Sequence, residues 1–115
     1  MNPLRRIWAY AMQSREKRDV DLIYAAAADQ LDEVKKLISN GSNVNAKDDL
    51  GITVLAHAAH RGCVEIVRYL LDHGANPNYR DAHGRTALGL VEECPYLVDN
   101  YETVKQVLKN GGAIM

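Results

Sequence analysis

The feature that most constrains this chain is an internal repeat with a period of 33 residues. Aligned with itself at that offset, the stretch from Leu22 to Leu55 matches the stretch from Leu55 to Leu88 at twelve of 34 positions, whereas composition alone would give about two or three. A fixed period of this length is typical of stacked supersecondary units, each of which buries its apolar face only against a neighbour. The sequence therefore predicts a solenoid. The matching pairs are mostly residues of core or turn type: Leu22/Leu55, Ala25/Ala58, Ala26/Ala59, Val34/Val67, Leu37/Leu70, Gly41/Gly74, Asn43/Asn76, Asn45/Asn78, Asp48/Asp81, Gly51/Gly84, Thr53/Thr86 and Leu55/Leu88.

Length and composition fit one soluble domain. The chain has 115 residues, of which 47% are hydrophobic and 25% charged. Its two cysteines, Cys63 and Cys94, are too few and too far apart for a disulfide framework, so we expect a reducing compartment and a cytoplasmic location. A net charge of −1 gives no overall reason to expect nucleic acid or a membrane surface as the partner. No apolar stretch is long enough to span a bilayer.

The middle copy of the repeat, residues 48–80, predicts two helices after a turn. Leu55, Ala58 and Ala59 share one face of a helix from Val54 to Arg61. Gly62 breaks that helix, and a second helix from Val64 to His73 ends at Gly74. The Asn76-Pro77-Asn78 segment then leads away as a loop, because proline cannot continue the helix.

The run from Gly51 to Asn78, GITVLAHAAHRGCVEIVRYLLDHGANPN, resembles the ankyrin repeat, a β-turn finger followed by two antiparallel helices. The resemblance extends over three units, at about 19–47, 48–80 and 81–115. It implies an all-α ankyrin-repeat solenoid of helix-turn-helix units with β-turn fingers. Val54 and Ala56 depart from the Pro and His of the family's T-P-L-H segment. Asp29 replaces the inter-helix glycine in the first unit, a position where Asp tolerates left-handed backbone better than most residues.

The last unit carries an insertion. Its second helix matches the middle unit at an offset of 37, which pairs Gly74 with Gly111. Four extra residues are therefore expected between its two helices, within 94–100. End units should lose the apolar surface that an inner unit buries on both sides, so we expect both flanking units to act as caps of a complete stack. Ile66 and Tyr69 of the middle unit are replaced as this requires, by Glu33 and Lys36 in the first unit and by Thr103 and Gln106 in the last.

Residues 1–18 predict one more helix. They carry five basic residues against a single Glu16, and Leu4, Ile7, Trp8, Ala11 and Met12 follow helical spacing. We interpret this segment as a basic amphipathic capping helix that covers an exposed edge of the first unit. The alternative is contact with anionic lipid or nucleic acid through the basic face, which would make binding strongly salt-dependent.

Catalytic and metal-binding chemistry find little support. The serines lie in no G-x-S-x-G elbow, and no phosphate-binding glycine loop is present, so no enzyme activity and no cofactor are expected. His57, His60 and Cys63 lie close enough in sequence to suggest a metal or redox site, but the sequence has no second cluster of ligand residues to complete one. We read His57, with Tyr24 and Leu90 at its equivalent positions, as a half-buried packing residue, and His60 as exposed.

With catalysis and metal binding set aside, the function we expect is recognition of another protein, with this chain acting as a monomer. In the ankyrin family, the fingertips and the exposed face of each first helix line a concave binding surface. Leu50 and Ile52 are the most telling residues of that surface, because an apolar side chain on a turn buries nothing within its own repeat. The resemblance implies a non-catalytic interaction module, with an inhibitor, immunity or regulatory subunit as the role we expect. Carried over by position, the predicted partner-binding residues are Asp49, Leu50, Ile52, His60, Arg61, Ala82, His83, Arg85 and Glu93, extended by Asp19, Ala27, Ala28 and Cys94.

Overall fold

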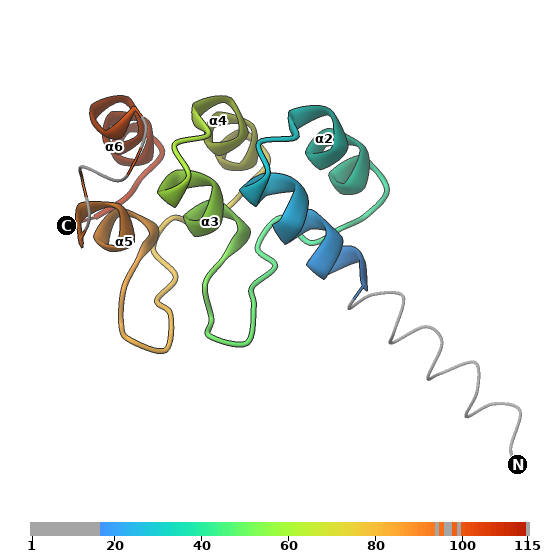
Figure 1. Cartoon of the computed structure of the whole chain (residues 1–115), viewed down its shortest axis with the longest axis horizontal. Helices are drawn as coiled ribbons and strands as arrows, with labels where there is room; N and C mark the ends of the chain where they lie inside the picture. Colours follow the sequence, from blue (N-terminus) through green and yellow to red (C-terminus); the bar gives the residue numbers. More distant parts are fainter. Residues whose placement is uncertain (1–16, 94, 96–97, 99, 115) are drawn as a thin grey trace, which may run out of the picture.

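The computed structural model describes residues 17–93, 95, 98 and 100–114. Within them, helices alternate between two parallel rows (Figure 1). One row holds a helix over residues 17–27, α3 (Val54–His60) and α5 (Ala87–Glu93); the other holds α2 (Leu31–Ser39), α4 (Val64–Asp72) and α6 (Tyr101–Asn110). Two long loops, one before α3 and one before α5, project side by side from the first row. This arrangement confirms the predicted all-α solenoid.

The core repeats with the sequence. Leu22, Leu55 and Leu88 stand at equivalent positions of the three units, and none is more than 2% exposed. Helix α3 packs against α5, and α4 packs against both α2 and α6. Each unit therefore buries its core leucines and valines against its neighbours, which is the contribution that a single helix pair cannot make alone.

The turn residues fix the helix boundaries. The Thr53 hydroxyl caps α3 by accepting a hydrogen bond from the Ala56 amide at 3.1 Å, and Thr86 does the same for the Gly89 amide at 3.2 Å. Gly62, which follows α3, has φ 74°, and Asp29 has φ 57° at the equivalent place after the first helix. Asp29 thus substitutes for glycine as predicted. The helices α3 and α4 each end one residue earlier than the pattern indicated.

Asparagines join successive units. The Asn45 side chain accepts a hydrogen bond from the Asn76 amide at 2.8 Å. At the next junction, the Asn78 side chain accepts from the Ile114 amide at 2.9 Å and donates to the Gly112 carbonyl at 3.0 Å. The Asn45/Asn78 identity of the repeat therefore has a physical basis, because both residues fasten a loop to the unit that follows.

The last unit differs from the expectation in its register. Seven residues, 94–100, separate α5 from α6, against three between α3 and α4, which confirms the four-residue insertion. However, Gly112 has φ 103° and Gly111 has φ −84°, so Gly112 is the counterpart of Gly74, whose φ is 90°. The pairing of Gly74 with Gly111 was wrong. Helix α6 has ten residues where α4 has nine, and this extra residue moves the terminal turn along by one.

The first and last units expose positions that the middle unit buries. Ile66 is fully buried in the middle unit, whereas Glu33 and Thr103 are exposed. Thr103 stands where the middle unit has Ile66, because the next residues, Val104 and Val67, make the same first-turn hydrogen bond, from their amides to the carbonyls of Asn100 and Cys63. Residues 17 and 18, the last two of the predicted capping helix, are the first two residues of the helix over 17–27. The rest of the predicted capping helix, residues 1–16, lies outside the described residues, so its role stays a prediction.

Candidate functional site

Each projecting loop is a finger held by one aspartate. We call residues 47–53 finger 1 and residues 80–86 finger 2. In finger 1, Oδ1 of Asp48 accepts hydrogen bonds from the amides of Leu50 and Ile52 at 2.9 and 3.0 Å. In finger 2, Oδ1 of Asp81 accepts from the amides of His83 and Arg85 at 2.8 and 3.0 Å. The same turn is therefore built twice, by the Asp48/Asp81 identity of the repeat.

The remaining oxygen of Asp48 ties finger 1 to helix α3. Nε2 of His57 lies 2.8 Å from Oδ2 of Asp48, and both side chains are partly buried. Burial raises the pKa of Asp48, but the hydrogen bonds from His57 and from the Ile52 and Leu50 amides together outweigh it, so the pKa lies below its ordinary value. The carboxylate is therefore ionised at neutral pH, and Nε2 of His57 donates to it.

Finger 2 uses an arginine for the same purpose. Nε of Arg85 donates to Oδ2 of Asp81 at 2.9 Å, and Nη1 of Arg85 donates to Oε2 of Glu93 at 2.8 Å. The Glu93 and Asp81 carboxylates raise the pKa of Arg85. Arg85 and Glu93 were predicted to bind a partner, but in the structure they bind each other and hold finger 2 against α5.

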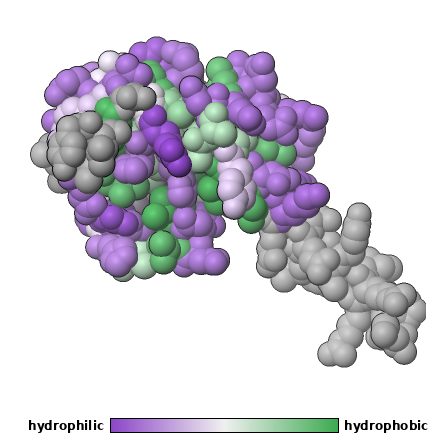
Figure 2. All heavy atoms as spheres, in the orientation of Figure 1, coloured by the Kyte–Doolittle hydropathy of each residue, from purple (hydrophilic) through white to green (hydrophobic). Residues whose placement is uncertain are grey.

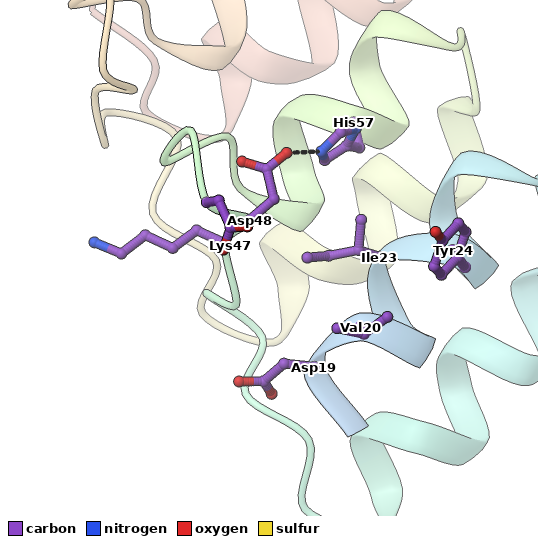
Figure 3. Close-up of a pocket in the computed structure, with 8 residues that line it drawn as sticks. Asp19, Val20, Ile23, Tyr24, Lys47, Asp48 and His57 are labelled. Carbon is purple, nitrogen blue, oxygen red and sulfur yellow. Dashed lines mark hydrogen bonds and ion pairs between the residues drawn. The ribbon is translucent and has the colours of Figure 1, made fainter. Parts of the chain in front are cut away.

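A groove of about 560 Å³ lies between the first helix and finger 1. The helix contributes an apolar side and finger 1 contributes a charged side, with His57 of α3 at the back (Figure 3). Ile23 points toward His57, whereas the Lys47 side chain extends away from the other labelled residues. The lining residues, which we call the groove residues, are Asp19, Val20, Ile23, Tyr24, Lys47, Asp48, Asp49 and His57.

The groove exists because finger 1 is paired on one side only within the described part of the chain. On its far side, the Leu50 carbonyl accepts a hydrogen bond from the Ala82 amide of finger 2 at 2.8 Å. On the near side the first helix faces finger 1 with no further finger between them. Large apolar side chains consequently stay open to solvent, with Val20 48% and Tyr24 72% exposed. Figure 2 likewise shows apolar patches between polar ones on this face of the molecule.

The predicted site residues fall into three groups. Asp49 and Asp19 line the groove, while Leu50, Arg61, Ala82 and His83 are exposed beyond it, and Leu50 is 53% exposed at the tip of finger 1. Ile52 is half-buried and packs against the core, so the expectation that it buries nothing within its repeat was wrong. His60 is half-buried rather than exposed. Ala27 is half-buried and Ala28 exposed at the end of the first helix, and Cys94 lies outside the described residues.

Most groove residues were missed by sequence reasoning. Tyr24 was expected to be half-buried like His57 at the equivalent position, but it is largely exposed, because finger 1 leaves it uncovered. Val20 gave a signal that was available: it is a large apolar residue where the other units have Thr53 and Thr86, the helix caps. The pairing of Asp48 with His57 depends on the finger folding back over α3, which spacing alone does not reveal.

Cys63 is buried in the core, and no three His, Cys, Asp or Glu side chains in the described part of the chain are placed to hold a metal ion. Among the same residues, no helix combines the length and the apolar composition needed to cross a membrane.

Comparison with known proteins agrees with the architecture. A family model described as ankyrin repeats in three copies matches residues 22–114. No curated protein matched the chain. The match spans most of the sequence and covers the three helix pairs and both fingers described above. The chain therefore belongs to the ankyrin repeat family.

Proposed function

We propose that this protein is a non-catalytic module that binds a partner protein across its fingers and its row of first helices. Ankyrin repeats are in general protein-protein interaction modules and typically have no enzyme activity. The observation that carries the proposal is the groove, where Val20 and Tyr24 remain exposed in a concave site. Apolar and aromatic side chains in such a position favour the centre of an interface.

Preorganisation supports this function. Asp48 fixes finger 1 through hydrogen bonds from two amides and His57, and Asp81 fixes finger 2 through two amides and Arg85. Binding to fingers that are already ordered loses little conformational entropy. A rigid face of this kind suits a protein that masks or inhibits its partner, so we propose an inhibitor, immunity or regulatory role, in the cytoplasm and as a monomer.

The exposed fingertip residues extend the proposed interface. Leu50 at the tip of finger 1, His83 on finger 2 and Arg61 after α3 are all exposed. We assign them to the rim, where single contacts contribute less than at a desolvated centre. The internal pairing of Arg85 with Asp81 and Glu93 makes Arg85 a support of finger 2 in this proposal.

The test compares two tyrosine variants in affinity capture from the native cell extract. Tyr24→Ala removes an aromatic side chain from the groove, while Tyr79→Ala removes one that is 47% exposed outside it. Loss of an aromatic anchor costs about 2 kcal/mol, or about 30-fold in affinity. We therefore expect Tyr24→Ala to lose a captured protein that the wild type and Tyr79→Ala both retain. Circular dichroism checks that both variants are folded.

Two further outcomes separate the possible sites. A partner that is lost with a Leu50→Ala, His83→Ala variant and kept by Tyr24→Ala would move the site from the groove to the fingertips. A partner kept by every variant would contradict binding through this face.

A further inference from the structure

We propose that the groove recognises a basic segment of the partner that carries a large apolar side chain. This inference rests on the proposed function and specifies the chemistry of what binds there. It combines the shape of the groove, its apolar helix side and the distribution of its charges.

The apolar side of the groove accepts a bulky side chain. Val20, Ile23 and Tyr24 lie at i, i+3 and i+4 on one face of the first helix, and Val20 and Tyr24 are 48% and 72% exposed. A volume of about 560 Å³ lies within the range of pockets that enclose compact ligands. A tryptophan or leucine inserted here would remove apolar surface of both partners from water, and the Tyr24 ring also offers a face to an arginine.

The charged side of the groove is acidic. Asp48 and Asp49 lie on finger 1 and Asp19 lies on the helix across from it, whereas the one lysine of the groove, Lys47, extends away from the other labelled residues (Figure 3). Asp48 is already occupied by His57 and two amides. Asp19 and Asp49 form no ion pair with another described residue, and Asp49 is exposed. These two carboxylates are therefore placed to accept bonds from the arginines or lysines of a partner.

The acidic character is local to the groove. On the neighbouring finger, the Asp81 and Glu93 carboxylates both pair with Arg85 and share its single positive charge. Finger 2 thus holds its carboxylates in internal ion pairs, whereas Asp49 of finger 1 forms none with another described residue, so charge complementarity directs a basic partner segment toward finger 1.

The experiment measures fluorescence anisotropy with the full chain and three labelled peptides. The basic apolar probe is Gly-Arg-Arg-Trp-Leu-Arg-Arg-Gly. One control replaces its four arginines by glutamates, and the other replaces Trp-Leu by Ser-Ser. We expect the basic apolar probe to bind most tightly and to weaken as salt is raised, because screening reduces the attraction between exposed charges.

Matched variants locate the binding. Asp49→Lys reverses a charge in the groove, and Glu65→Lys makes the same change on α4, where the Glu65 side chain is 68% exposed and outside the groove. Reversing one exposed charge changes binding by about 1 kcal/mol, so we expect Asp49→Lys to weaken the basic probe about fivefold and Glu65→Lys to leave it nearly unchanged. Tyr24→Ala should weaken the basic probe about tenfold and should barely affect the serine control.

The proposal is overturned by any of three results: equal or tighter binding of the glutamate peptide, equal loss with Asp49→Lys and Glu65→Lys, or no binding of the basic probe. It is also overturned if the wild type forms a dimer that Tyr24→Ala dissociates in sedimentation, because the occupant is then a second copy of this chain. In each case, a partner whose capture depends on Tyr24 would still support the proposed function and would refute only the chemistry assigned to the groove.

Discussion

Asp48 holds finger 1 through three donors, two backbone amides and the His57 ring, at 2.8 to 3.0 Å. The pKa of Asp48 is lower in the folded protein than its ordinary value, so the unfolded chain binds the proton more tightly. The stability that this carboxylate contributes is therefore present above about pH 4, the ordinary range of an aspartate, and is lost as the pH falls through the lowered pKa.

We predict that Asp48→Ala lowers the free energy of unfolding by about 1 to 3 kcal/mol at pH 7, because two turn amides and His57 lose their acceptor. The difference from the wild type should shrink below about pH 4, where the wild-type carboxylate also becomes protonated. Urea unfolding at several pH values measures both effects. A difference that stays constant from pH 7 to pH 3 would mean that the ionised form of Asp48 does not stabilise the finger.

The Ser42 hydroxyl contrasts with the Asp48 carboxylate, because it is a buried polar group that forms no hydrogen bond in the described structure. Its Oγ atom is buried and has no hydrogen-bond partner in the described structure, whereas the next unit has Ala75 at the equivalent position. We predict that Ser42→Ala raises the free energy of unfolding by about 1 kcal/mol, because the unpaired hydroxyl is removed from an apolar site. Ala75→Ser is the reciprocal control and should destabilise. Thermal unfolding distinguishes the two, and a loss of stability in Ser42→Ala would show that its hydroxyl does have a partner.

At the scale of elements, the tight turns between paired helices are nearly equivalent, although their residues differ. Asp29 takes φ 57° where Gly62 takes φ 74°. A left-handed conformation costs a residue with a Cβ atom roughly 1 kcal/mol, and glycine avoids this cost.

We predict that Asp29→Gly raises the free energy of unfolding by about 0.5 kcal/mol, because relief of the left-handed strain outweighs the added flexibility of the unfolded chain. Gly62→Ala should lower it by about 1 kcal/mol for the same reason. Denaturant unfolding of both variants tests the pair. Should Asp29→Gly prove destabilising, the aspartate side chain must stabilise the turn by an interaction of its own.

The helices could be predicted closely from the sequence because their boundaries depend on local residues. Thr53 caps α3, and Gly62 and Gly74 end the two arms of the middle unit. The end of α6 could not be predicted in this way, because Gly111 and Gly112 are adjacent and either can adopt the left-handed turn. The hydrogen bond from the Ile114 amide to Asn78 accompanies the turn at Gly112, and that contact comes from another unit.

At the scale of the whole molecule, the sequence predicted the stack but only part of the groove. Asp49 and Asp19 were identified because the family places binding residues on fingers and first helices. Tyr24 and Val20 were not, because their exposure depends on which side of finger 1 has a neighbouring finger. Repeat periodicity describes what the units share, whereas the groove arises where the first unit departs from the others.

Coupling between units should depend on the two asparagines. Asn78 makes two hydrogen bonds to the last unit, and Asn45 makes one to the middle unit. We predict that Asn78→Ala lowers the free energy of unfolding by about 1 to 2 kcal/mol and Asn45→Ala by about 1 kcal/mol. Amide hydrogen exchange should speed up mainly in α6 for Asn78→Ala. Faster exchange spread evenly over all helices would instead indicate that the stack unfolds as one unit.

The asparagine junctions also determine how the molecule would respond to a pulling force. Within the described residues, four hydrogen bonds join the middle and last units: both bonds of Asn78, the Leu50 to Ala82 backbone bond and the bond from Asn100 to Gly62. Two join the first and middle units, from the Asn76 amide to the Asn45 side chain and from the Val54 amide to the Ala46 carbonyl. Tension applied along the stack loads these joints in series, so the joint with fewer bonds yields first. A stretched molecule is expected to part beside the groove, and the proposed binding face would then be lost before the rest of the stack comes apart.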